Sequence, residues 1–504
     1  MDRMFVEVDL TVGSITEKHG DLPDSLYEFE REFLSSLDGN ELVFFFSGST
    51  LRVSFISPRN KRRVEATTTS LISLRASELG LSAICFKGSA HRLSFVDILA
   101  DKREINPCEQ FRFSSPLEFS RILISREGDG TLAIGKAGEK YSPLASVVVD
   151  SSFMFGHGGL GAVLGSMNLK GICISSGRTT TLEKGKINEK SRLQKRIKRD
   201  GDLALVPEAF RNGWAPVKNF SGRKDPRVVH LSGESFGRCF PGNTLDTPFA
   251  DMFSALQLGA NLGFYDPVTV QTLFEGCMAL GLDAAEVGVV LAHVKALKKV
   301  AYPLPDISHA ELEDLLLLLD QVSGRGGAGE ELNSLAIQMT GEHAFLPLCD
   351  LRGSLMMAIS YALGDSYPAY ADLAFGLSHR FSSEHVGLMY AYFRAYTLAL
   401  LELGVDPEIK IVALAERLFR YVPPSGFLIR KFLLHCSFGK LKGRDLIRSV
   451  IAKMSSETLE EIPPFFTENI GENDYTDEIR EKELTGSYLR EVDMLMRKYG
   501  KVSK

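Results

Sequence analysis

Hydrophobic and polar residues alternate with a period of two through much of the first third of the chain. Such alternation is typical of strands that bury one face. At residues 5–20 two alternating runs flank a turn, which predicts a β-hairpin. Further strand-like runs lie at 41–56, 81–98 and 118–150. The pattern therefore predicts a β-rich domain over residues 1–176.

From about residue 203 onward, apolar residues recur every three to four positions, which is typical of amphipathic helices. We expect helices at 251–262, 267–280, 284–297, 309–322, 330–340, 354–363, 384–403, 407–420 and 425–435. Asp266 and Ser308 stand where helix N-caps belong. The glycine-rich segment 324–329 is interpreted as a connecting loop, because no strand precedes it and no Gly-Lys-Ser/Thr follows.

These patterns predict an α+β protein, with an N-terminal β-rich domain of two packed sheets followed by mainly α-helical domains. The expected divisions are a β-rich domain at 1–176, a basic linker and helix at 177–202, a helical middle domain at 203–345 and a helical C-terminal domain at 346–504.

Composition changes this picture little. The chain has 504 residues, of which 44% are apolar and 24% charged, and its net charge of −6 gives no general attraction to nucleic acid. We expect no membrane span and a cytoplasmic location, because the chain has no long apolar run and no signal-like start. The basic stretch 184–199 could bind phosphates, but without interleaved aromatic residues we favour a solvated linker and helix.

The seven cysteines are dispersed and include no Cys-x-x-Cys, so no local zinc or cluster motif is present. Dispersed single cysteines of this kind are usually small buried hydrophobic residues.

The most distinctive stretch of the chain is glycine-rich and runs from residue 156 to 172. Glycine lets the backbone take positive φ and approach a ligand closely, and successive amides can form an anion-binding concavity. The candidate ligand contacts in this stretch are Gly156, His157, Gly158, Gly159, Gly161, Asn168 and Lys170. His157 could contact a phosphate or cap backbone groups. Asn168 and Lys170 could bind an anion or end a strand at the surface, which is the interpretation we favour.

This stretch resembles the signature loop of the tungsten-dependent aldehyde ferredoxin oxidoreductase family. In that family a glycine-rich segment followed by Gly-Ala-Val-x-Gly-Ser-x-Asn-Leu-Lys borders the pterin cofactor. Arginine is usual where this chain has His157. Segments at 132–139, 212–220, 258–263, 277–283, 346–353 and 397–406 resemble further family segments in the same order. The chain is thereby identified as a divergent and shortened member of the family.

The resemblance implies an enzyme of anaerobic metabolism that oxidises an aldehyde to a carboxylic acid. The cofactors it implies are a tungsten-bis-pterin, magnesium that links the pterin phosphates, and a [4Fe–4S] cluster that passes electrons to ferredoxin. Asp283, Asp350, Arg352 and Arg63 are the further candidate cofactor contacts. Asp283 could instead be the N-cap of the helix that follows it, and Asp350 and Arg352 could form a local ion pair.

Several positions depart from the family pattern. A [4Fe–4S] cluster needs four thiolates, but only Cys239 remains as a vestigial cluster position. Met278 and Leu401 stand where the family has aspartates that accept N–H bonds from the pterin rings. Since neither side chain can accept such bonds, the departures favour loss of the cluster and of the pterin.

Three hypotheses follow. The chain could be an oxidoreductase of the family, with a partner subunit in place of its own cluster. It could be a cofactor-free pseudoenzyme that binds an intact homologous subunit or forms a homodimer. It could also bind an anion or nucleotide through the glycine-rich loop and the basic stretch 184–199. We favour assignment to the family with a degenerate site and doubtful activity, and keep the pseudoenzyme as the alternative, because most cluster ligands and pterin ligands are replaced by residues that cannot serve.

Overall fold

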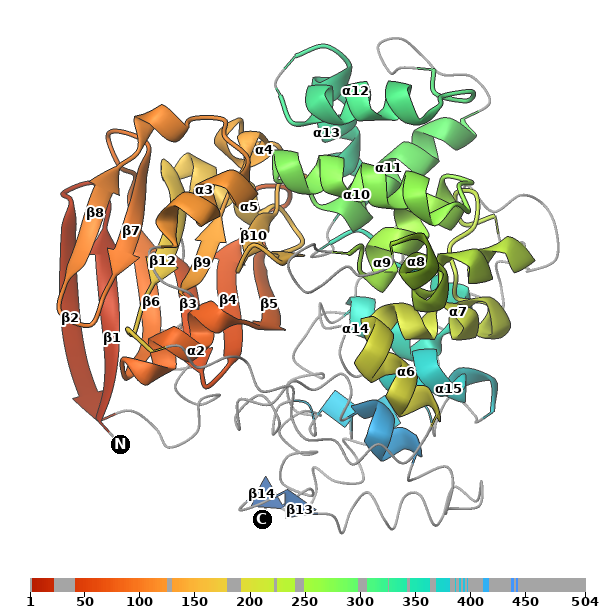
Figure 1. The fold of residues 1–504 in the computed structure, drawn as a ribbon, viewed down its shortest axis with the longest axis horizontal. Coiled ribbons are helices and arrows are strands. Elements are labelled where there is room, and N and C mark those ends of the chain that lie inside the picture. The colour runs from red at the N-terminus through yellow and green to blue at the C-terminus, as the bar shows by residue number, and fades with distance from the viewer. Residues whose placement is uncertain are drawn as a thin grey trace.

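The computed structural model describes residues 2–21, 41–124, 129–178, 192–221, 224–240, 249–297, 306–324, 326–341, 345–362 and 369–380. Beyond these it describes 386, 389–390, 393–394, 397, 411–416, 437–438 and 441–442. The strands of the first third of the chain lie together on one side of the molecule, and the larger helices lie on the other (Figure 1).

The first sheet has six strands. Its order is β2 (Ser14–Asp21), β1 (Asp2–Asp9), β6 (Leu81–Lys87), β3 (Leu42–Ser47), β4 (Thr50–Ile56) and β5 (Arg63–Thr69). Only β1 and β6 are parallel neighbours. The predicted N-terminal hairpin is confirmed, because β1 and β2 pair antiparallel and close with Asp9 opposite Ser14.

The second sheet also has six strands. Its order is β11 (Phe153–Phe155), β10 (Val147–Val149), β9 (Gly130–Ala133), β12 (Leu169–Ile174), β7 (Ser94–Ile98) and β8 (Arg103–Pro107). Here β12 and β7 are the parallel pair. Strand β12 is thus the last strand of the predicted β-rich domain, and it lies between β9 and β7 within this sheet.

The two sheets bury a common core. Phe44 and Ile84 of the first sheet belong to the same buried cluster as Leu132 and Ile172 of the second. Burial of apolar side chains on both inner faces holds two such sheets together. The expected pair of packed sheets is thus confirmed.

Among the described residues, the sheets are accompanied by the short helices α2 (Leu71–Glu78), α3 (Pro116–Leu123), α4 (Lys136–Glu139) and α5 (Leu160–Ser166). The later part of the described chain is mainly helical. It contains α6 (Arg192–Asp200), α7 (Val206–Asn212), α8 (Gly233–Cys239), α9 (Met252–Ala255), α10 (Pro267–Leu280), α11 (Ala284–Ala296), α12 (Leu312–Val322), α13 (Ala328–Thr340), α14 (Leu355–Ala362) and α15 (Tyr370–Phe375). A π-helical segment, Leu256–Asn261, continues α9.

Local capping chemistry explains which helix ends were predictable. The Asp266 side chain accepts a 2.9 Å bond from Thr269 N, and α10 begins where expected. The prediction that Ser308 caps the helix expected at 309–322 is wrong. This helix is α12, and Glu311 caps it in a reciprocal capping box with Asp314. The helix predicted at 425–435 lies outside the described residues, as does most of 384–403 and 407–420.

The sheets and the helices meet directly at the start of α11. Ser146 N donates to Gly281 O at 2.9 Å, and Asp283 N donates to Leu144 O at 2.8 Å. Figure 1 shows α10 beside α4 at this junction. A Cβ on Gly135, just before α4, would lie 2.4 Å from Leu280 O, so glycine is required for this approach. Within the described part of the chain, the helices are too short or too polar to cross a membrane.

Candidate functional site

The glycine-rich loop between β11 and α5 takes the backbone conformation that its glycines permit. Gly156, Gly158 and Gly159 have φ values of 89°, 87° and 90°. Residues with a Cβ rarely adopt this positive-φ region of backbone conformation. The loop therefore needs glycine at these three positions for its path alone.

The same glycines also pack tightly against the protein itself. A Cβ on Gly156 would lie 2.3 Å from Leu160 Cδ2, and one on Gly159 would lie 2.8 Å from Pro58 Cγ. A Cβ on Gly161 would lie 2.5 Å from Ser146 O. The space beside these glycines is thus filled by neighbouring protein atoms.

A buried ion pair lies against this loop. Arg59, from the β4–β5 connection, donates from Nη1 to Glu286 Oε1 at 2.7 Å, and its Nη2 donates to Oε2. The side chains of both residues are fully inaccessible to solvent. Arg59 Nε also donates to Pro143 O at 2.8 Å. The pair therefore joins the first sheet to the start of α11.

Two backbone amides complete the surroundings of the Glu286 carboxylate. Leu346 N donates to Oε1 at 2.9 Å, and Gly158 N donates to Oε2 at 3.4 Å. Burial alone would raise the pKa of Glu286, but the Arg59 guanidinium holds it below its ordinary value. Glu286 is consequently an ionised carboxylate inside the protein.

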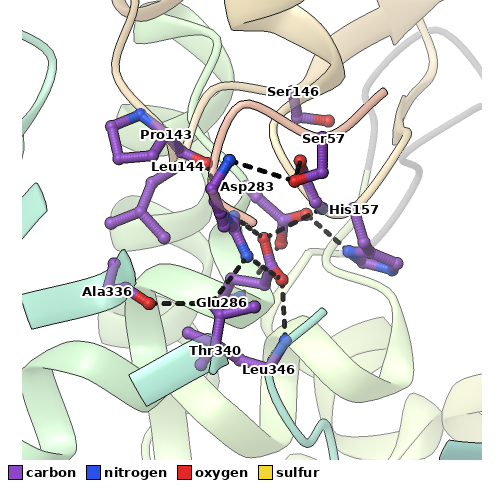
Figure 2. Close-up of polar contacts among 12 residues, drawn as sticks. Ser57, Pro143, Leu144, Ser146, His157, Asp283, Glu286, Ala336, Thr340 and Leu346 are labelled. Atoms are coloured by element: carbon purple, nitrogen blue, oxygen red, sulfur yellow. Dashed lines mark hydrogen bonds and ion pairs between the residues drawn. The ribbon is translucent and has the colours of Figure 1, made fainter. Parts of the chain in front are cut away.

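His157 and Asp283 form a second pair beside the first. His157 Nδ1 lies 2.5 Å from Asp283 Oδ2, and the His157 ring packs on Phe345 with centroids 5.9 Å apart. Figure 2 shows His157 and Asp283 on one side of Glu286, with Thr340 and Leu346 on another.

The two partners of this second pair differ in exposure. The Asp283 side chain is 4% exposed, whereas that of His157 is 40% exposed. Burial lowers the pKa of His157, but the Asp283 carboxylate raises it to about 9, with Glu286 and Asp251 contributing. His157 is therefore an imidazolium at neutral pH.

The alternative interpretation of Asp283, as a helix N-cap, is confirmed. Its Oδ1 accepts a 3.0 Å bond from Glu286 N, three residues along α11. One carboxylate thus serves both the helix and His157.

The same group includes three side chains that could act as metal ligands. Within the described residues, His157, Asp283 and Glu286 are the one set of three donors with ligand atoms close enough, all within 4.8 Å of one another. Both carboxylates are already paired with cations, since Arg59 binds Glu286 and His157 binds Asp283. A metal ion here would have to lie beside a guanidinium, so the charge arrangement disfavours it.

Asn168 and Lys170 form hydrogen bonds within the β-rich part of the molecule. Asn168 has φ 52° and donates from Nδ2 to Ala90 O at 2.7 Å. The favoured surface location is wrong for Lys170, whose side chain is fully buried. Lys170 Nζ bonds Glu139 at 2.5 Å and Ser114 O at 2.9 Å, because Glu139 at the end of α4 supplies the compensating charge.

The other candidates from outside the loop lie in different surroundings. Arg63, the first residue of β5, donates to Ser54 Oγ at 3.0 Å. Asp350 is buried, and its backbone N–H donates to Trp214 O at 2.8 Å. The side chain of Arg352 lies outside the described atoms, so its ion pair with Asp350 stays a prediction.

Cys239 and Met278 stand where the family has a cluster ligand and a pterin ligand. Cys239 is exposed at the end of α8, and the donor group found in the described residues includes no cysteine. Four thiolates for a [4Fe–4S] cluster are thus not gathered in this part of the chain. Met278 is fully buried in the helical core, where a thioether offers a pterin no carboxylate fork. Leu401 lies outside the described residues.

The sequence prediction missed Arg59 and Glu286, the centre of this network. Asp283 and Glu286 have the Asp-x-x-Glu spacing typical of a helix start. The one available signal was a glutamate three residues after the candidate contact Asp283. Its partner stands 227 residues earlier.

Two sequence comparisons find similarity to one family. A family model described as "Aldehyde ferredoxin oxidoreductase, N-terminal domain" matches residues 40–176. The tungsten-containing aldehyde ferredoxin oxidoreductase of Pyrococcus furiosus is 26% identical over 336 residues, which is 56% of this chain and 55% of that protein. The protein of the same name from Pyrococcus horikoshii is 25% identical over 56% of each chain. The chain spans about half the length of these relatives.

A solved structure shares the fold over nearly the whole chain. It is the active site complex BamBC of benzoyl coenzyme A reductase in complex with 1,5-dienoyl-CoA. The TM-score is 0.63 with 15% sequence identity, and the match covers 99% of this chain and 97% of that one.

Proposed function

We propose that this chain is a cofactor-free member of the aldehyde ferredoxin oxidoreductase family that binds another protein and does not itself oxidise aldehydes. The observation that carries the proposal is the network of charged side chains beside the glycine-rich loop. In this network the charged groups are already paired with one another. Arg59 donates to the Glu286 carboxylate, and Gly158 N donates to the same carboxylate. These donors are therefore unavailable to the phosphates that a pterin would bring.

The lost ligands support the proposal independently. An enzyme of the family's kind needs thiolates for its cluster and acceptors for its pterins. Here Cys239 stands exposed at the end of α8, and Met278 is part of the helical core. A fold that keeps its packing but lacks these cofactor ligands can still bind another protein through its surface.

The partner we propose is an intact homologous subunit, with a homodimer as the alternative assembly. The structural neighbour is an active site complex, which supports assembly on this fold. Residues that once held a cofactor would then contribute only to the rigidity of the protein that is bound.

A second candidate is the family reaction itself, favoured by the relatives' name as tungsten-containing aldehyde ferredoxin oxidoreductases. Under it, a partner subunit would supply the electron exit toward ferredoxin. The residues described here provide no acceptor at Met278 for a pterin, so this chain alone would not suffice.

One experiment separates the two. The protein is purified anaerobically from its host, beside an intact relative handled identically, and tungsten, molybdenum and iron are measured per chain. We expect metal well below one atom per chain here and near one tungsten in the relative. Near-stoichiometric tungsten in this protein, with aldehyde-dependent dye reduction, would overturn the proposal. Co-purification of an intact homologue that carries the tungsten would support the proposed partner.

A further inference from the structure

Four N–H donors converge on the carboxylate of Glu286. They are the two terminal nitrogens of Arg59 and the backbone amides of Leu346 and Gly158. A guanidinium fork joined by backbone amides is a typical arrangement for binding a carboxylate or another oxyanion. Here the oxyanion is part of the protein.

We infer that Glu286 is an internal anion that plugs a carboxylate-binding cradle, and that the cradle takes a free small carboxylate when this side chain is removed. The inference rests on the proposed function to the extent that the site holds no cofactor. It names the residue that closes the site and the class of ligand that the site selects.

Glu286 is not held in place by helix capping. In a capping box the glutamate at this position would accept from the N–H of the N-cap residue. The N–H of Asp283 instead donates to Leu144 O at 2.8 Å. The Glu286 carboxylate is thus free of the helix start and is directed at Arg59.

The donors are fixed by contacts other than Glu286. Arg59 Nε is held by Pro143 O at 2.8 Å, and Arg59 N donates to Ser57 Oγ at 3.2 Å. Ser57 Oγ in turn donates to Gly158 O at 2.9 Å, which holds the loop amide in place. The cradle should therefore keep its shape when the carboxylate is removed.

The size of the cradle points to a small monocarboxylate. Both charged side chains are fully buried, so the space is that of the Glu286 side chain itself. Replacing Glu286 with alanine removes one methylene and one carboxylate, which are the atoms that acetate supplies. Phosphate is bulkier and carries more charge than a single guanidinium compensates.

Acetate rescue tests the inference. The midpoint of thermal unfolding is measured for Glu286→Ala in sodium chloride and in sodium acetate of equal ionic strength. We expect a lowered midpoint in chloride and a saturable rise toward the wild-type value in acetate. Phosphate should give a smaller rise or none. If the variant is recovered folded only when purified in acetate, that recovery is itself the rescue.

Two variants provide the controls. Glu286→Gln fills the same volume, so acetate should not raise its midpoint. Arg59→Met combined with Glu286→Ala keeps the space but lacks the cation, so acetate should not raise that midpoint either. Equal rescue of the double variant, no rescue of Glu286→Ala, or failure to recover Glu286→Ala in either salt would overturn the inference. Metal content is measured separately, so tungsten binding would overturn the proposed function without deciding the acetate result.

Discussion

Removal of the Arg59 guanidinium should destabilise the protein strongly and change the sign of its pH dependence. Arg59→Met keeps an apolar stem but leaves the fully buried Glu286 carboxylate without its cation. Breaking a buried pair in this way costs about 3–5 kcal/mol. Since Arg59 belongs to the sheets and Glu286 to α11, the loss should weaken the junction between them.

The pH dependence follows from the two pKa shifts. In the wild type the pKa of Glu286 is lowered, so the pair stabilises the fold above the ordinary glutamate pKa and loses this contribution as the pH falls through the lowered value. Without Arg59, burial should raise the pKa of Glu286. The penalty is then present above that raised pKa and is relieved as the pH falls. The difference in stability between the two proteins should shrink from about pH 7 to about pH 5.

Urea unfolding followed by tryptophan fluorescence is a suitable assay. The chain has one tryptophan, Trp214, which is fully buried in the helical core. Arg227→Met is the matched control, because the Arg227–Asp225 pair leaves the arginine side chain 55% exposed, so its loss should be much smaller than that of Arg59→Met. A loss below about 1 kcal/mol for Arg59→Met, or a loss that does not change with pH, would refute the reasoning.

Three further predictions concern other parts of the structure. Lys170→Met leaves a buried glutamate unpaired and should cost about 3–5 kcal/mol in urea unfolding, whereas Lys136→Met, which breaks a partly exposed pair, should cost under about 1 kcal/mol; equal losses would contradict the burial argument. The pKa of His157 is raised to about 9, so its contribution is complete below about pH 6.5 and is lost as the pH rises through about 9. Urea midpoints between these values should fall less in His157→Gln than in the wild type, and identical slopes would exclude the histidine. Gly165→Ala places a Cβ 1.9 Å from a backbone oxygen and should cost about 1–3 kcal/mol, more than Gly237→Ala, another helical position, whose Cβ meets no atom within 4 Å. A smaller loss for Gly165→Ala would show that the backbone can yield there.

The sequence predicted most elements whose signals are local. Helix α10 begins and ends at the expected residues, because Asp266 caps its start and Gly281 takes the left-handed conformation, with φ 72°, after its end. The start of α12 was placed too early, because Ser308 is a good N-cap residue but Glu311 and Asp314 form a better one together. The choice between such neighbours depends on the packing of the whole helix.

The candidate site was predicted only in part. His157 and Asp283 were both named from the sequence, but nothing local indicated that they form a pair 126 residues apart. Lys170 was expected at the surface, because a lone lysine at the start of a strand is normally solvated. It is buried because Glu139 meets it from α4, a contact that no period or spacing expresses.

By itself, the sequence determined most of the strands, the main helices and the glycines of the loop, since each of these depends on neighbouring residues or on identity at one position. The tertiary structure alone decided which charges meet. Glu286 is ionised and buried because the fold brings Arg59, Gly158 and Leu346 to it from three distant segments. Burial makes an unpaired charge costly, so the partner of a buried charge must come from wherever the fold supplies it.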